Sequence, residues 1–190
     1  MLDVAVSFLA EQFNAYLIRR TGSASLGQVV PGAIVDDTGK LAITSGTVAM
    51  AIVNIEEERV MREQLPARVM VGGREMTLQP ELRLNLTLLF AARMTNYDMT
   101  LKALSNVLTF FQGAPAFAAE DYPSLDPRIG RIVMELHSVG PETLNQLWAA
   151  IGAKYQPSVL YRARLVTIQD QEPLGFGAPI TDIGLDLHER

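Results

Sequence analysis

Apolar residues recur at helical spacing near the start of the chain. The stripe consists of Leu2, Val6, Leu9, Phe13 and either Tyr16 or Leu17, which fall on one face of a helix. Arg19 and Arg20 follow in what would be its last turn, where cations are favoured by the unpaired carbonyl groups. The polar positions mix both signs of charge and form no basic stripe. We therefore expect this helix to pack on a sheet rather than on a membrane surface.

A second helix is predicted over residues 97–112. Asn96 or Asp98 can cap its start, and Gly113 can end it. The apolar stripe expected to face the core is Leu101, Leu104, Leu108 and Phe111. Phe110 stands next to this stripe, which leaves two readings of the double phenylalanine: both rings lie in the core, or one ring turns toward a neighbouring molecule.

A helix, a corner and a strand follow one another over residues 144–168. The helix has one apolar stripe, which we expect to lie in the core: Leu144, Leu147, Trp148 and Ile151. Pro157 cannot continue a helix and biases Gln156 toward an extended backbone. The residues that follow Ser158 alternate as in a strand. The chain's single tryptophan therefore lies at the centre of this unit.

Other stretches are typical of strands and loops. Residues 47–55 are apolar and β-branched, which predicts a buried strand, and residues 82–90 alternate, which predicts a half-buried one. Weaker strands are predicted over 29–35, where Pro31-Gly32 breaks the run, and over 129–138, with Ile132, Met134 and Leu136 on one face. Taken alone, the run Gly-Arg-Ile-Val-Met-Glu-Leu at 130–136 would also tolerate a helix. The expected turns and loops are 36–40, 63–75 and 114–128.

Strands separated by helices predict an α+β fold with a mixed or mostly antiparallel sheet. About three amphipathic helices are expected to cover one face of this sheet. Residues 1–168 form the predicted domain, and residues 169–190 form a Pro/Gly-containing acidic arm with five acids against one arginine, a net charge of −4. The domain then has 16 acids and 15 basic residues, so its net charge is only −1. A nearly neutral body associates with its own copies more easily than a highly charged one.

The residues of common catalytic and metal sites are scarce. The chain contains no cysteine and only two histidines, His137 and His188, which are too few donors for zinc sites of that type. The side chains of the acidic run at 56–58 point to alternate faces of an extended backbone, so they cannot converge on one ion without ligands from elsewhere in the chain. We therefore predict no enzyme and no catalytic, cofactor-binding or metal site. The net charge of −5 argues against nucleic acid as a partner, and no segment is apolar enough to span a bilayer.

Three blocks of sequence carry a resemblance to a known family. They are Asn-Ile-Glu-Glu-Glu-Arg at 54–59, Leu-Ser-Asn-Val with Thr-Phe-Phe-Gln between 104 and 112, and Leu-Asn-Gln-Leu-Trp with Lys-Tyr-Gln-Pro-Ser-Val and Tyr-Arg-Ala-Arg between 144 and 164. In this order they resemble the cap, or tail-terminator, proteins of extracellular contractile injection systems of the antifeeding-prophage type. The resemblance covers roughly residues 1–168.

This resemblance implies a structural protein of a phage-tail-like particle. Such a protein is expected to form a hexameric ring at the end of the tube and sheath away from the baseplate, where it stops polymerisation. The implied partners are other copies of the chain and the tube and sheath proteins, with no cofactor. Assembly would take place in the cytoplasm, and the ring would become part of a cytoplasmic or released particle.

Matching positions are carried over residue by residue. The candidates for a subunit, tube or sheath interface are Asn54, Glu56, Arg59, Phe110, Phe111, Tyr155, Gln156, Pro157, Ser158 and Tyr161. Asn145 and Trp148 also match the family, and we expect Trp148 to have a core role. The corner at 155–157 is the stronger candidate for a contact surface.

Two other classes of function stay open at this point. One is a small-molecule-binding domain or an enzyme that uses carboxylates around a pocket. The other is an adaptor between the tail and another component of the particle, in which residues 169–190 would be the docking segment.

Overall fold

A six-stranded sheet organises the chain. The computed structural model describes residues 1–23, 26–58, 67–71, 74–78, 82–168 and 175–176. Within these ranges the elements are α1 (Leu2–Thr21), β1 (Gln28–Pro31), β2 (Thr47–Glu57), β3 (Ala67–Val71), β4 (Arg74–Leu78), β5 (Leu82–Arg93), α2 (Tyr97–Gly113), β6 (Ala116–Ala118), β7 (Gly130–Leu136), α3 (Pro141–Ile151), β8 (Ser158–Ile168) and β9 (Gly175–Phe176).

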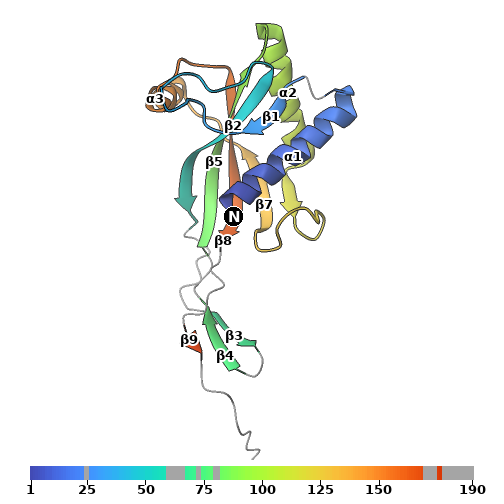
Figure 1. Ribbon diagram of the computed structural model, residues 1–190, viewed down its shortest axis with the longest axis vertical. Coiled ribbons are helices and arrows are strands. Elements are labelled where there is room, and N and C mark those ends of the chain that lie inside the picture. Colours follow the sequence, from blue (N-terminus) through green and yellow to red (C-terminus); the bar gives the residue numbers. More distant parts are fainter. Residues whose placement is uncertain (24–25, 59–66, 72–73, 79–81, 169–174, 177–190) are drawn as a thin grey trace, which may run out of the picture.

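The strand order of the main sheet is β1-β2-β5-β8-β7-β6. Strands β1 and β2 run parallel, and the other neighbouring pairs are antiparallel. Long strands β2, β5 and β8 form its centre, and each pairing within this centre contains a register shift. Such irregularities increase the twist of a sheet, and the sheet curls around α1 (Figure 1). The predicted α+β fold with a mixed, mostly antiparallel sheet is confirmed.

The larger core lies between one face of the sheet and helices α1 and α2. From α1 it contains Phe8, Leu9, Phe13 and Leu17, and from α2 it contains Ala103, Val107, Phe110 and Phe111. The helix predicted at the start of the chain is confirmed. Its C-cap Gly22 has a φ of 71°, a conformation that favours glycine. For α2, Asn96 rather than Asp98 is the cap, because its side chain accepts a hydrogen bond from the backbone N–H of Met99.

A smaller core lies on the opposite face, under α3. Trp148 packs there with Leu89, Ala91 and Leu160 of the sheet and with Ile34 and Ile43 of the segment between β1 and β2. The expectation that three helices cover one face is therefore wrong, because α3 lies on the other side of the sheet from α1 and α2 (Figure 1). With both faces covered, the predicted half-buried strand at 82–90 is buried on both faces from Leu84 to Ala92.

The buried face of α2 also differs from the predicted stripe. Leu101 is 44% exposed, whereas Val107 and Phe110 are buried. The helix carries apolar residues on more than one side, so spacing alone does not single out the face that meets the sheet. Leu136 of β7 is likewise exposed, although Ile132 and Met134 are buried as expected.

The loop predicted at 63–75 contains a strand and the start of another. Strands β3 and β4 pair in an antiparallel hairpin, and β9 from the predicted arm pairs with β4. The loop predicted at 114–128 contains the short strand β6, and the strand predicted over 29–35 ends at Pro31. Apart from Gly175–Phe176, the predicted arm lies outside the described residues.

The edge strand β1 is capped by a side chain of α1. The Asn14 side chain accepts a hydrogen bond from the Val29 N–H at 2.8 Å and donates one to the Val29 carbonyl oxygen at 2.9 Å. An edge strand with unpaired backbone groups is a template for another strand. Asn14 therefore stabilises the edge and closes it at Val29.

Replacing Asn14 by alanine is expected to lower the free energy of unfolding by about 2 kcal/mol, because two backbone groups of buried Val29 lose their partners. Urea unfolding monitored by circular dichroism measures this change. Glu11→Ala on the exposed side of the same helix is the control and should change stability by less than about 0.5 kcal/mol. Equal stability of the two variants would contradict a structural role for the cap.

Candidate contact surface

A ladder of charged residues runs from the end of β2 and the residue after it across β8 to β7, on the face that also carries α3. A guanidinium nitrogen of Arg162 lies 3.7 Å from a carboxylate oxygen of Glu56. The guanidinium of Arg164 lies 3.7 Å from a carboxylate oxygen of Glu58 and 3.1 Å from one of Glu135. Residues 160, 162 and 164 share one face of β8, and Leu160 belongs to the core under α3. The ladder therefore continues that face toward the ends of β2 and β8. With five alternating charges it offers both signs to a polar partner.

Beneath this ladder, Asn85 of β5 is 8% exposed. Its Nδ2 atom donates a hydrogen bond to a Glu58 carboxylate oxygen at 3.0 Å, which positions the carboxylate under Arg164. Within the described part of the chain, Asn85 Oδ1 and Arg162 Nε are buried without a hydrogen-bond partner. Buried polar groups are normally paired, so these two atoms are exceptions among the described residues.

The candidates from the first sequence block fall at this ladder. Asn54 donates a hydrogen bond to Glu56 at 2.8 Å, and both lie at the exposed end of β2. Arg59 lies outside the described residues. Sequence reasoning missed Arg162 and Arg164 as candidates, although their alternation on the predicted strand placed both on one face. Only the strand register shows that they stand opposite the acidic run.

The candidates at the corner between α3 and β8 differ in exposure. Tyr155 is 58% exposed, and its ring meets Trp148 edge-on with 5.9 Å between the ring centroids. The side-chain amide of Gln156 donates a hydrogen bond to the Lys154 carbonyl oxygen at 3.5 Å. The Pro157 carbonyl oxygen accepts from the Ala92 N–H, which fixes the corner to β5. Ser158 is half-buried, so Tyr155 is the group this corner presents to solvent.

Three aromatic candidates lie in the larger core instead of on the surface. Phe110 is 7% exposed, Phe111 2% and Tyr161 4%. Phe110 packs against Phe13 at 5.6 Å, and Phe111 packs against Tyr161 at 4.9 Å. Burial raises the pKa of Tyr161. Of the two readings of the double phenylalanine, the one with both rings in the core is correct.

The predicted helix at the third block is confirmed as α3, with Pro141 in its first turn and Gly152 at its C-cap. Trp148 is 2% exposed and has the core role expected of it. Its predicted stripe partners are only partly buried and pack against the same core: Leu144, Leu147 and Ile151. Asn145 is exposed on the outer side of this helix.

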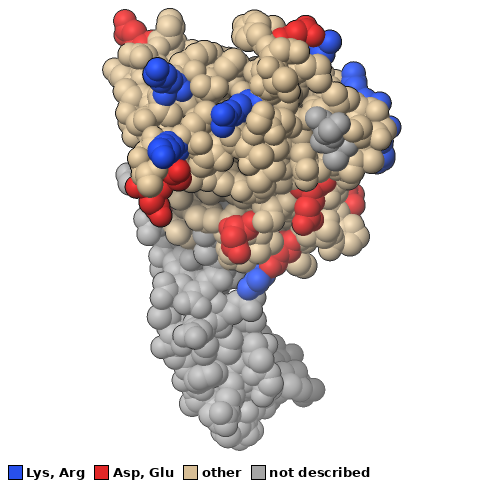
Figure 2. Space-filling view, turned by 45° about the horizontal axis from the view of Figure 1, so that its top comes forward, with Lys and Arg blue, Asp and Glu red and all other residues tan. Residues whose placement is uncertain are grey.

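On the face drawn in Figure 2, basic side chains are scattered over the upper part, acidic side chains gather along the lower edge of the described body, and a wide surface of other residues lies between them. Large exposed apolar side chains on the body include Tyr97 and Leu101 of α2 and Ile18 of α1. Among the described residues, no group of three histidine, aspartate or glutamate side chains is placed to hold a metal ion. No helix in the described ranges has the length and apolar character to cross a membrane.

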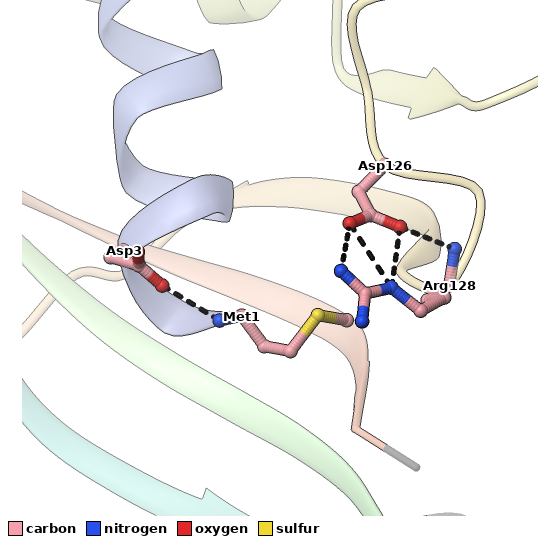
Figure 3. Close-up of polar contacts among 4 residues, drawn as sticks. All are labelled: Met1, Asp3, Asp126 and Arg128. Carbon is pink, nitrogen blue, oxygen red and sulfur yellow. Dashed lines mark hydrogen bonds and ion pairs between the residues drawn. The ribbon is translucent and has the colours of Figure 1, made fainter. Parts of the chain in front are cut away.

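A separate charged contact joins Asp126 to Arg128 near the start of α1 (Figure 3). The Arg128 side chain donates hydrogen bonds to both carboxylate oxygens, the shorter at 2.6 Å, and its backbone N–H donates another at 2.9 Å. These bonds lower the pKa of Asp126 to about 2, with a smaller contribution from the positive N-terminus. The folded pKa lies below the ordinary value of 3.8, so the stabilisation is present above that value and is lost as the pH falls toward 2.

Arg128→Ala is expected to return the pKa of Asp126 toward 3.8, because the hydrogen bonds from the Arg128 side chain are the main cause of the lowered pKa. A carboxyl-detected NMR titration measures the midpoint. Arg131→Ala, which removes an exposed arginine nearby in the chain, should leave the midpoint at about 2. A midpoint near 3.8 in the unsubstituted chain would show that the contact does not form in solution.

The fold and its candidate residues define an α+β domain with helices on both faces of a six-stranded sheet. The chain belongs to the Pvc16 N-terminal domain family, whose model matches residues 6–182. Comparison with curated proteins gives no match.

Two solved structures are similar in fold. A sheath/tube terminator of PVC, an extracellular contractile injection system, in its extended state matches with a TM-score of 0.56 and 14% identity over 96% of this chain. The anti-feeding prophage cap, a tube-terminating cap, matches with a TM-score of 0.54 and 13% identity over 91% of this chain. This chain spans 62% of the first structure's chain and 60% of the second's.

Proposed function

We propose that this chain is a structural terminator of a contractile, phage-tail-like injection particle. The observation that carries the proposal is the fold, which aligns over 96% of the chain with a sheath/tube terminator. The family match over residues 6–182 supports the same reading. The partners are the tube and sheath proteins of the same particle, and neither nucleic acid nor membrane takes part.

Termination follows from the geometry of a ring. A tube grows because each added ring presents a fresh copy of the surface that it has just bound. A terminator matches the exposed end on one face and presents no such copy on the other. We propose that six copies of this chain form the ring through head-to-tail contacts that close on themselves, at the end away from the baseplate.

The surface of the described body suits such contacts. Its charges are of both signs, and its exposed apolar residues lie on several elements. The candidate interface residues outside the larger core stay proposals for direct contact: Asn54, Glu56, Arg59, Tyr155, Gln156, Pro157 and Ser158. The buried aromatic candidates act indirectly, because they hold α2 against the sheet. The role is mechanical, and we propose no catalytic step.

Assembly takes place in the cytoplasm under this proposal, and the ring leaves it only as part of the particle. Size-exclusion chromatography with light scattering tests the ring. Six copies of a 20.8 kDa chain give a species of about 125 kDa. A mass of 20.8 kDa at every concentration, together with failure to bind purified tube or sheath ends, would reject the proposal.

A further inference from the structure

A hollow lies between α3 and the corner that follows it. Its volume is about 360 Å³, and its lining includes Leu144, Asn145, Trp148, Ala149, Lys154 and Tyr155. The walls are mostly apolar, and the hollow is large enough for one or two aliphatic side chains.

Trp148 lines this hollow and carries a polar atom that is buried behind the surface of the hollow. The side chain is 98% buried, and within the described residues its Nε1–H has no hydrogen-bond acceptor. A buried indole N–H usually has one. Tyr155, whose ring meets the indole edge-on, is itself 58% exposed. If Tyr155 turned outward and uncovered the indole N–H, a backbone carbonyl group could supply the acceptor, which points to a peptide ligand.

Charge limits which peptide fits. Lys154 is the one charged residue in the lining, so the hollow favours an acidic segment. In this chain, residues 177–190 contain three acids against one arginine, and aliphatic residues stand next to the acids: Asp182-Ile183 and Leu185-Asp186-Leu187. An aliphatic side chain in the hollow with an acid beside Lys154 matches both requirements.

We propose that the hollow at α3 binds residues 177–190 of a second copy of this chain. The inference rests on the proposed ring and names one way in which its copies hold each other. The aliphatic side chains of the segment enter between Trp148 and Tyr155, a backbone carbonyl accepts from the Trp148 indole, and an adjacent acid pairs with Lys154.

Disulfide trapping tests this proposal cleanly, because the chain contains no cysteine. Two full-length variants with different affinity tags are mixed under oxidising conditions. One carries Ala149→Cys in the lining of the hollow, and the other carries Leu185→Cys. The control replaces Ala150, an exposed alanine on the same helix that does not line the hollow. We expect the doubly tagged dimer to form roughly tenfold faster with Ala149→Cys than with Ala150→Cys, because binding raises the local thiol concentration.

Two further measurements test the same contact. Adding Lys154→Glu to the Ala149→Cys variant should slow trapping roughly fivefold, since an attractive charge pair becomes repulsive. A peptide of residues 177–190 added to ¹⁵N-labelled full chain should shift the single indole N–H resonance downfield. Equal trapping at 149 and 150, or an indole resonance unmoved by the peptide, would overturn the proposal.

The outcomes also separate this inference from the proposed function. A ring of about 125 kDa, six times the 20.8 kDa of one chain, could form without disulfide trapping at position 149. That result would reject the inference and leave the proposed terminator function standing. Trapping at Ala149 in a chain that binds neither tube nor sheath would keep the inference and reject the terminator. A disulfide that closes only within a single chain carrying both substitutions would place the segment on its own copy and contradict the proposal.

Discussion

Replacing Trp148 by alanine is expected to lower the free energy of unfolding by about 3–5 kcal/mol. Trp148 is the one fully buried residue of α3 and the centre of the smaller core. Its removal leaves a cavity between the helix and Leu89, Ala91 and Leu160 of the sheet. The other apolar residues of α3 are only partly buried, so their contacts with the sheet cannot replace the stabilisation that Trp148 provides.

Urea unfolding followed by circular dichroism measures this loss. Tyr97→Ala is the matched control, since Tyr97 is an aromatic helix residue that is 68% exposed. It should change stability by less than about 0.5 kcal/mol. A Trp148→Ala variant as stable as this control would show that α3 is not anchored to the sheet by the indole.

Phe110→Ala is expected to cost about 3–5 kcal/mol of stability in the isolated chain. The ring contacts Phe13 of α1 and Phe117 of β6, so it joins both helices and the end of the sheet. If Phe110 instead faced a neighbouring molecule, its removal would weaken assembly and leave the isolated chain unchanged. The substitution therefore separates the core reading from the interface reading.

Leu101→Ala on the same helix is the control for this test. Leu101 is 44% exposed, so its loss should cost less than about 1 kcal/mol in the isolated chain. Thermal unfolding at a concentration below self-association measures both variants. A larger loss for Leu101→Ala than for Phe110→Ala would mean that the helix packs through the stripe predicted from its sequence.

Local signals predicted α3 well because they act within a few residues. Pro141 stands in the first turn of the helix, and Gly152 at its end has a φ of 78°. One stripe identified its inner face, and the single tryptophan is its buried centre. The strand that follows the Pro157 corner is also present as β8.

The faces of β5 and α2 depend on contacts far away in the sequence. Asn85 and Thr87 predicted a solvent-facing side for β5, yet both are buried on the face that carries α3. On α2, Phe110 and Phe111 point in directions about 100° apart. Both are buried because α1 covers one side of the helix end and the sheet covers the other.

The charged ladder required the strand register. Glu56 and Arg162 are separated by more than a hundred positions and lie on strands that are not direct neighbours, since β5 runs between them. Spacing along the chain carries no information about such a pair. The sequence pattern therefore predicted which elements form and some of the faces that are buried. Only the structure shows which surface charges pair with each other.

The length distribution of particles assembled without this chain tests its role as a terminator most directly. Electron microscopy of particles from a deletion strain is compared with particles from the same strain supplied with the intact chain. We predict that tubes without the chain vary widely in length and extend past the normal limit, and that supplying the chain restores one narrow length. A narrow, unchanged length in its absence would contradict termination by this protein.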